Sequence, residues 1–467
     1  MTHLKTPRAN ALTSVLIAAG VLAASVPARA DQLDDLQAAV QKLQAQIAEL
    51  KAHQAATDQK VAEQPPAVAA PAFKIDPAPA PWTLDAQVGQ ASALPPIPRL
   101  LQLQGNGGSI MLYGDIDEFI NVMHTSKGIT MKNVQDGALL RSRWGLNGSK
   151  DFGNGYGGAF VLESGINATN GTAADQPNAN ATGLTTSGRL FDRQAWGGMA
   201  TPYGEFRVGR QNTEIFTSGN YIDYTERTMG SVVNNFGAPA RYDGDFAYIS
   251  PRISGVQLAA HYAVGGGGTQ TAGLTSQGVA QFHADYLTGP LRVGYAGLVA
   301  KPAAGAAMTK EVYYHNLYVN YDYGQGTIYG VYIHTNNGGG ALAGTGGNEV
   351  GNVPTVLPGT NATVNTAYDI YQLSADYRVT PTLRVGGVWG DIRDSDSSAG
   401  DATGWSLGAY WQAFSNMMFY GLVDQMDNSS KASFGLAGSA GLTKNFSGAN
   451  LTGQRITGLQ VGGLFRF

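Results

Sequence analysis

Arginines and carboxylates that alternate with apolar residues are the side chains of this 467-residue chain with the clearest chemical potential. Arg141, Arg143 and Asn147 have one parity in "RSRWGLNG", whereas the tryptophan and leucine between them have the other. Because successive side chains of a strand point to opposite faces, these polar groups would share one face of a β-sheet. The same rule places on a polar face Glu163, Glu205, Arg207, Arg292, Arg384 and Arg466. A row of this kind can attract or repel ions and orient polar solutes.

Residues for covalent or metal chemistry show no comparable order. No G-x-S-x-G motif is present, and the histidines at 124, 261, 283, 315 and 334 lack the spacing of metal ligands. The segment "DIRDSDSSAGD" gathers Asp391, Asp394, Asp396 and Asp401, but the glutamate that closes an EF-hand loop is missing. We expect a solvated acidic loop there, with a calcium site as the alternative. The sequence therefore predicts no enzyme and no cofactor.

Residues 1–30 have the features of a secretory signal peptide. They combine a basic start at His3, Lys5 and Arg8, an apolar run at residues 11–24 that is too short to span a bilayer, and an A-x-A motif at residues 28–30. The alternative is a helix that the product retains. Cleavage would remove three lysine and arginine residues and change the net charge from −4 to −7, so we expect no nucleic-acid partner. The chain has no cysteine, which excludes disulfides and thiolate metal sites.

A heptad repeat follows over residues 31–64. Its a and d positions include Leu33, Leu36, Val40, Leu43, Ile47 and Leu50. An isolated helix would leave this apolar seam in water, so we predict a periplasmic coiled coil whose stoichiometry the repeat does not fix. A helix that folds back on its own domain is the alternative. Residues 65–108 are rich in proline and alanine and are predicted to be an extended linker.

Residues 109–467 alternate in a way that predicts an all-β domain. Seven short turns, such as "TPYG" from Thr201 and "TGP" from Thr288, alternate with eight longer segments rich in Gly, Asn, Thr and Ala, which gives sixteen antiparallel strands. Short turns on one rim and long loops on the other are typical of an outer-membrane β-barrel. A sheet in lipid must close because every backbone group has to be paired. The tail "GLQVGGLFRF" would close it, with Leu459, Val461, Phe465 and Phe467 facing lipid.

Several segments resemble the trimeric general-diffusion porins of Gram-negative bacteria, of the β-proteobacterial and neisserial type. They are "MLYGDIDEFI", "SRWGLNGSKDFGNGYGGAFVLESGIN", "GRLFDRQAWGGMATPYGEFRVGRQNTEIF" and "RYDGDFAYISPRISGVQLAAHYA", together with the terminal Phe467. The resemblance implies a homotrimer of sixteen-stranded barrels in the outer membrane, each narrowed by an inward-folded third loop at about residues 212–240. It implies a constriction in which Glu214, Asp223 and Glu226 of the loop face Arg143, Arg193 and Arg241 of the wall. The alternation adds Arg141, Glu163 and Arg207 as further pore-lining candidates. Arg193 shares its parity with Phe191, so its inward position follows only from the resemblance.

The predicted function is passive diffusion of small hydrophilic solutes and ions through a water-filled channel, with a lean towards anions. Two alternatives stay open. The helix and linker look like the extensions of some phosphate and dicarboxylate porins, which suggests a selective porin for small carboxylates or sugars, although the barrel region has only seven lysines. The second alternative is an envelope tether in which the coiled coil binds peptidoglycan while the barrel anchors it in outer-membrane lipid.

Overall fold

The computed structural model describes the following residues: 41–42, 45–46, 48–49, 52, 102–105, 107–173, 190–233, 241–264, 278–300, 311–336, 367–438, 441–442 and 451–467. The chain divides into two units, Met1–Ala72 and Phe73–Phe467. The described residues of the first unit, between 41 and 52, are helical and exposed. The predicted signal peptide, the apolar heptad positions and residues 65–101 of the predicted linker lie outside the described residues. Coiled-coil formation therefore stays a prediction.

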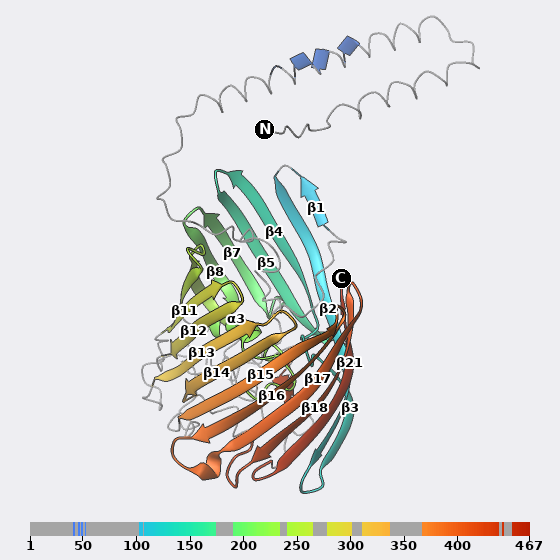
Figure 1. Cartoon of the computed structure of the whole chain (residues 1–467). Helices are drawn as coiled ribbons and strands as arrows, with labels where there is room; N and C mark the ends of the chain where they lie inside the picture. The colour runs from blue at the N-terminus through green and yellow to red at the C-terminus, as the bar shows by residue number, and fades with distance from the viewer. Residues whose placement is uncertain are drawn as a thin grey trace, which may run out of the picture. The chain divides into compact units, whose positions relative to one another are not determined.

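The second unit is a β-sheet closed on itself (Figure 1). Its strands are β1 (Gln102–Gly105), β2 (Gly108–Thr125), β3 (Thr130–Asp136), β4 (Arg143–Gly153), β5 (Tyr156–Asn167), β6 (Thr172–Ala173), β7 (Gln194–Thr201), β8 (Gly204–Asn212), β9 (Arg241–Ile249), β10 (Val256–Ala263), β11 (Val279–Thr288), β12 (Leu291–Ala300), β13 (Val312–Asp322), β14 (Thr327–Thr335), β15 (Tyr368–Thr380), β16 (Leu383–Asp394), β17 (Ala402–Phe414), β18 (Met417–Asn428), β19 (Ala437–Gly438), β20 (Gly441–Leu442) and β21 (Arg455–Arg466).

Sixteen of the described strands form the barrel wall, once β3 and β4 are taken as one interrupted strand that pairs with successive parts of β2. The short β1 and β6 only extend β2 and β5, and β19 and β20 form a separate ribbon. Closure occurs between β2 and β21, with Asp115 opposite Arg466. The backbones of Gly114 and Phe467 exchange two hydrogen bonds of 2.9 and 3.0 Å. The predicted closing strand and the sixteen-stranded antiparallel barrel are confirmed.

The two rims differ as predicted, with two exceptions. All seven connections of the short-turn rim contain two to six residues. On the other rim, β2 and β3 are joined by only residues 126–129, and β16 and β17 by only residues 395–401, which include a 3-10 turn, η5 (Ser398–Gly400). The sheet also begins at Gln102, inside the segment predicted to be linker. These shorter connections leave the topology unchanged.

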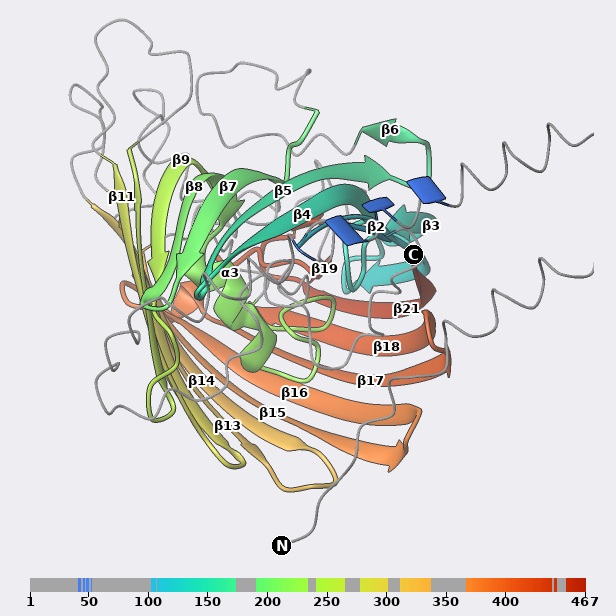
Figure 2. The same cartoon turned by 90° about the horizontal axis from the view of Figure 1, so that it is seen from above.

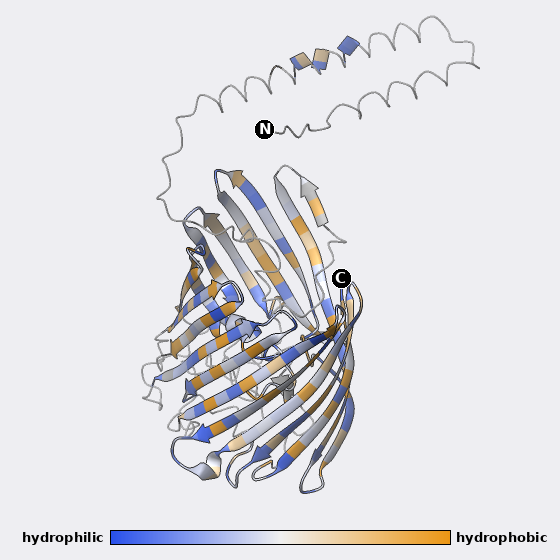
Figure 3. Cartoon of the chain, viewed as in Figure 1, coloured by the Kyte–Doolittle hydropathy of each residue, from blue (hydrophilic) through white to orange (hydrophobic). Residues whose placement is uncertain are grey.

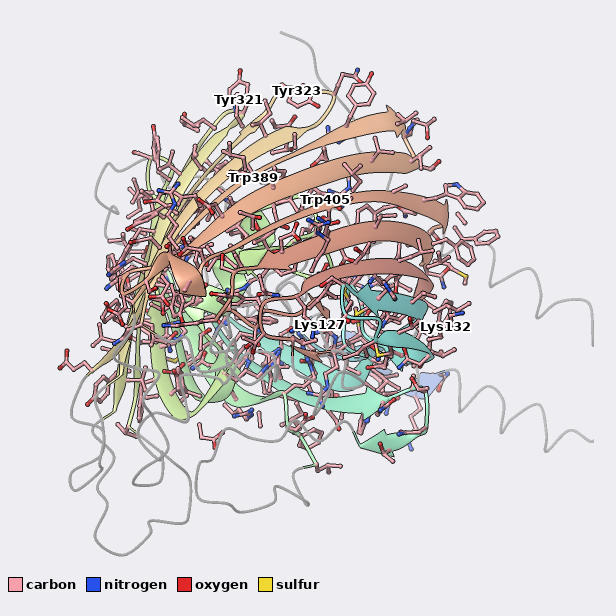
Figure 4. All side chains as sticks on the ribbon, turned by 90° about the horizontal axis from the view of Figure 1, so that it is seen from below. Lys127, Lys132, Tyr321, Tyr323, Trp389 and Trp405 are labelled. Atoms are coloured by element: carbon pink, nitrogen blue, oxygen red, sulfur yellow. The ribbon has the colours of Figure 1, made fainter. Side chains whose placement is uncertain are left out.

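Hydrophobic and hydrophilic residues alternate along the strands (Figure 3), and their burial assigns the apolar ones mainly to the outer face. On β21, Leu459, Val461 and Phe465 are exposed, whereas Gln460 and Arg466 are buried. Exposed aromatic rings such as Tyr321, Tyr323 and Trp389 add to the outer face (Figure 4). Aromatic residues of this kind border the lipid-facing band of outer-membrane barrels. The predicted assignment of the tail to the lipid-facing side therefore agrees with its exposure.

The third long connection, residues 213–240, is named L3 here and is described as far as Val233. It begins with α3 (Glu214–Ser218) and the 3-10 helix η1 (Gly219–Tyr221), and it lies inside the ring of strands (Figure 2). Thr213 caps α3, because its Oγ1 accepts a hydrogen bond of 3.1 Å from the Phe216 amide. The apolar core of the barrel joins L3 to the wall through Ile222, Tyr224 and Val232. The predicted inward fold of the third loop is confirmed.

Candidate constriction site

One side of the barrel interior carries a connected set of ion pairs. The Nε atoms of Arg143 and Arg466 lie 2.8 and 2.6 Å from the two carboxylate oxygens of Asp115. Glu163 is fully buried and pairs with Arg193 at 2.6 Å, and with Arg143 at 3.9 Å. The Tyr113 hydroxyl donates a further hydrogen bond of 3.0 Å to Glu163. These residues come from β2, β4, β5, β21 and the residue before β7, so strand pairing alone brings them together.

Arg241 completes this set at the start of β9. Its guanidinium lies 4.9 Å from the ring centroid of Phe216 in L3, and it acts electrostatically on Glu163. We name the group Asp115, Arg143, Glu163, Arg193, Arg241 and Arg466 the wall cluster. Arg141, also predicted at the constriction, lies beside it and pairs with Asp192 at 3.1 Å. The wall cluster has four positive and two negative side chains, a net charge of +2.

L3 turns its own carboxylates away from the wall cluster. Oε1 and Oε2 of Glu214 lie 3.0 and 2.6 Å from His261 on β10 and His283 on β11. Burial disfavours the charged form of Glu214, but hydrogen bonds from these two histidines outweigh it and hold the pKa of the carboxyl well below its usual range. Glu214 is therefore an ionised anchor on the β10–β11 wall.

Asp223 organises the next part of L3. Its Oδ1 accepts hydrogen bonds from the backbone amides of Thr225 and Arg227 at 2.9 and 3.2 Å, and its Oδ2 accepts from Ser231 and from Gln372 of β15. The amide oxygen of Gln372 in turn accepts from the backbone of residues 232 and 233. Asp223 thus fastens L3 to β15.

The turn beside Asp223 is strained. Glu226 and Arg227 have φ angles of 62° and 60°, in the left-handed region that residues with a side chain seldom adopt. Arg227 donates hydrogen bonds to the Ile215 carbonyl at 3.2 Å and to the Tyr314 hydroxyl of β13 at 3.1 Å. Glu226 interacts electrostatically with Arg384 of β16. The surrounding contacts therefore hold these residues against the strain, with both side chains on the β13–β16 side.

Two glycines let L3 approach the wall closely. A Cβ atom at Gly386 would lie 2.3 Å from Cδ2 of Tyr224, and one at Gly390 would lie 2.8 Å from Val232. Real Cβ atoms do not approach so closely, so only glycine fits at these positions of β16. The Tyr224 hydroxyl also lies 2.9 Å from Ser406 Oγ on β17. Burial raises the pKa of Tyr224, which keeps this hydroxyl neutral.

Three further predicted inward arginines form pairs near the short-turn rim. Arg207 binds Glu205 on the same strand with two hydrogen bonds of 2.7 and 2.8 Å, Arg292 binds Asp285, and Arg384 binds Asp376. In each pair the arginine side chain is the more exposed partner, at 11, 19 and 15% against 4, 2 and 3%. These pairs therefore present their positive ends to the interior.

The closed barrel with a charged interior agrees with a match to a known family. A family model described as Gram-negative porin matches residues 86–431. This chain belongs to the Gram-negative porin family. An outer membrane porin protein of Bordetella pertussis is 31% identical over 174 residues, which are 33% of this chain and 42% of that relative, so the match spans less than half of the relative's length. Family membership places this porin in the outer membrane of a Gram-negative bacterium.

Solved porins confirm the fold. The anion-selective porin from Comamonas acidovorans has a TM-score of 0.59 at 19% identity and covers 77% of this chain and 100% of its own. OmpF of Salmonella typhi, in complex with daunomycin, has a TM-score of 0.54 at 16% identity and covers 79% of this chain and 100% of its own. Because the identities are low, these likenesses concern the fold of this porin.

The wall cluster contains a residue that the sequence analysis did not assign. Asp115 of "MLYGDIDEFI" joins two arginines, and its shared parity with the polar residues Asp117 and Asn121 could have identified it as inward. Arg193 lies within the cluster although Phe191 shares its parity, because it precedes β7 and is not part of the regular strand. Glu214 has two partners, His261 and His283. Both histidines have inward parity on their strands, but nothing in the sequence links them to L3.

The described part of the porin contains neither a membrane-spanning helix nor a metal-binding group. None of its helices has the length and hydropathy to cross a bilayer. Its histidines and carboxylates form no group of three suited to a metal ion. In the acidic segment, Asp394 accepts backbone hydrogen bonds from Asp396 and Ser397, and Asp391 pairs with Arg393. Asp394 therefore shapes the short loop between β16 and β17, while Asp391 forms its pair within β16.

Proposed function

We propose that this porin forms a water-filled channel through which small hydrophilic solutes and ions diffuse passively. The family match, the closed barrel of sixteen strands and the charged interior support the proposal. A barrel of this strand number is wide enough for an aqueous path, whereas eight strands would be filled by side chains. Diffusion needs no chemical step, so the constriction residues act by size exclusion and by their electric field.

The observation that carries the proposal is the division of charge across the interior. The wall cluster has a net charge of +2, while Glu214 and Asp223 bind the β10–β15 side. The arginines of the wall cluster are only 2–6% exposed, so their net positive charge would act on solutes that pass L3 through its electric field and not by direct contact. In a site partly screened from water this field acts over several ångströms. The channel would then favour small anions.

Single-channel recording in a planar bilayer tests both statements. We expect stepwise conductance that rises linearly with salt, and a reversal potential of the anion-selective sign under a KCl gradient. Replacing Arg143 and Arg193 together by glutamine should lower the anion preference, whereas Arg378→Gln, in an exposed pair with Asp322, should leave it unchanged. Absence of conductance would overturn the channel. A cation-selective potential would overturn the role of the wall cluster.

Solute addition distinguishes a general porin from a selective one. A general channel should conduct independently of added dicarboxylates and sugars. Saturable flux or block of the current at low solute concentration would instead establish a selective porin, the alternative raised by the N-terminal extension. The assembly is proposed to be a homotrimer, as in the family that the sequence resembles. Conductance steps in groups of three, together with chemical cross-linking, would test this proposal.

A further inference from the structure

The first turn of L3 is attached to the barrel by a small buried charge network. Glu214 lies between His261 and His283, which stand on the paired strands β10 and β11. His261 also lies 2.8 Å from Asp245 of β9 through its Nδ1 atom, and His283 lies 2.9 Å from the Tyr318 hydroxyl of β13 through Nε2. His261, His283, Asp245 and Tyr318 are all buried. In addition, the backbone amide of Glu214 donates a hydrogen bond of 3.1 Å to the side-chain oxygen of Gln281.

The groups beside the ring nitrogens decide the charge of both imidazoles. Nδ1 of His261 shares a hydrogen bond with Asp245, and its Nε2 lies 3.0 Å from Glu214 Oε1 in an ion-pair contact, so a bare nitrogen on either side would face an oxygen's lone pairs and both nitrogens carry a proton. The Tyr318 hydroxyl donates to Asp285 at 3.0 Å, so its oxygen is left to accept from Nε2 of His283. His283 therefore donates from both nitrogens as well, and both imidazoles are cationic in this arrangement.

Other charged groups that face the network leave this assignment unchanged. Asp285 on β11 is already paired with Arg252 of the β9–β10 turn and with Arg292 of β12. Arg227 reaches the Ile215 carbonyl within L3, and Arg241 of β9 lies over Phe216. Two imidazolium groups thus balance Glu214 and Asp245, while the neighbouring acid has its own arginines.

We propose that Glu214, His261 and His283 are positioning residues that hold the root of L3 against the wall, and that alkaline pH releases the root by removing an imidazole proton. This inference rests on the proposed channel function in one respect, namely that L3 is the element that narrows the channel. Loss of a proton from His261 replaces a donor by a lone pair that faces a carboxylate. For one proton, the ratio of anchored to released loops falls about tenfold per pH unit between the titration of this imidazole in the released loop and its titration in the anchored loop.

A cysteine-labelling experiment tests the anchor without relying on conductance. The chain has no native cysteine, so Ile215→Cys, at a fully buried position of α3, would be a unique reporter. The full-length porin carrying it is treated with a polar maleimide between about pH 6 and about pH 10. Because thiolate formation itself accelerates labelling, each rate is divided by the rate of the denatured protein at the same pH. The normalised rate should rise by about tenfold per pH unit between the titration of His261 in the released loop and its titration in the anchored loop.

Two further variants identify the source of the effect. Ile215→Cys combined with Glu214→Gln should label rapidly at every pH, because the neutral amide no longer binds two cations. Met229→Cys, a buried reporter elsewhere in L3 whose backbone binds Ala138, should show little pH dependence. A flat normalised rate for Ile215→Cys up to about pH 10 would overturn the proposal, as would equal rise at both reporters, which indicates general unfolding. Labelling does not require conductance. If the porin labels as expected but does not conduct, the proposed channel function is overturned and the proposed anchor of L3 is not.

Discussion

The barrel interior has two walls that hold buried polar groups in different ways. The wall cluster joins β2, β4, β5, β21 and the residue before β7 by ion pairs that share two carboxylates, and Arg241 of β9 acts on one of them electrostatically. The opposite wall, from β13 to β18, has apolar and tyrosine side chains that pack against L3 in one continuous core. Hydrophobic burial and hydrogen bonds thus hold this side of the loop, next to the charged anchor of its root at Glu214, while the ionic wall stays on the other side. The comparison indicates that docking of L3 and the field at the constriction can be changed separately.

The largest expected effect comes from breaking the ionic wall at its centre. Glu163→Gln would leave Arg143 and Arg193 buried without their shared carboxylate. Removing one partner of a buried pair costs about 3–5 kcal/mol, so the free energy of unfolding should fall by that order. Denaturant unfolding of the folded barrel would measure the loss.

The matched control for Glu163→Gln is a surface pair. Asp322→Asn breaks the pair between Asp322 and Arg378, whose side chains are about half exposed, at 46 and 47%. Such pairs contribute about 0–1 kcal/mol, so this variant should unfold almost as the parent does. Equal losses for the two variants would contradict the buried, mutually dependent character of the wall cluster.

A smaller effect is expected from overpacking the apolar wall. Gly386→Val would place a side chain where Tyr224 now lies, because even a Cβ atom would be 2.3 Å from that ring. Overpacking of this kind costs about 1–3 kcal/mol and should displace L3 from β16 without disturbing the ion pairs. Protease cleavage within L3 should become faster while the reversal potential keeps its sign. Gly421→Val is the control, since nothing lies closer than 4.0 Å to its Cβ.

Period-two alternation explains why the barrel could be predicted from the sequence. Arg143 and Glu163 were assigned inward, and Leu459 and Val461 outward, because a strand fixes the face of each residue once its period is recognised. L3 has no such period, so the sequence could not show that Glu214 binds histidines some 50 to 70 residues later. The fit of Tyr224 against Gly386 likewise depends on how the loop crosses the barrel.

The connections on the loop rim show a second limit of the sequence. Composition predicted eight long segments, but residues 126–129 close the first of them as a short turn. The chain then bends inward between β3 and β4, where Asp117 accepts hydrogen bonds of 2.7 Å from the amides of Leu139 and Leu140. Within this bend, the Ala138 carbonyl also accepts a hydrogen bond from the Met229 amide of L3. A break that depends on contacts with a distant loop has no local signal.

Acid should weaken the attachment of L3 through Glu214 less than it weakens a contact made by a carboxylate with an ordinary pKa. The lowered pKa of Glu214 means that its stabilisation is fully present above the pKa of the unfolded chain and is lost only as the pH falls through the lower folded value. An unperturbed glutamate would already be half protonated at about pH 4.3. We therefore expect single-channel conductance and noise at about pH 4 to match those at neutral pH. Closing events that begin in the ordinary carboxylate range would contradict the anchored, ionised state of Glu214.

The smallest expected effect on the pore comes from removing the N-terminal extension. Deleting residues 31–64 takes away the predicted coiled coil and leaves every residue of both interior walls in place. Conductance and ion preference should be unchanged, because the field at the constriction arises from the wall cluster and falls off within a Debye length of about 10 Å at 0.1 M salt. If the helices bind peptidoglycan, the deleted form should no longer co-sediment with cell-wall sacculi, whereas the full chain should. A changed reversal potential would instead mean that the extension contributes charge to the channel, and the two walls would no longer suffice to explain its selectivity.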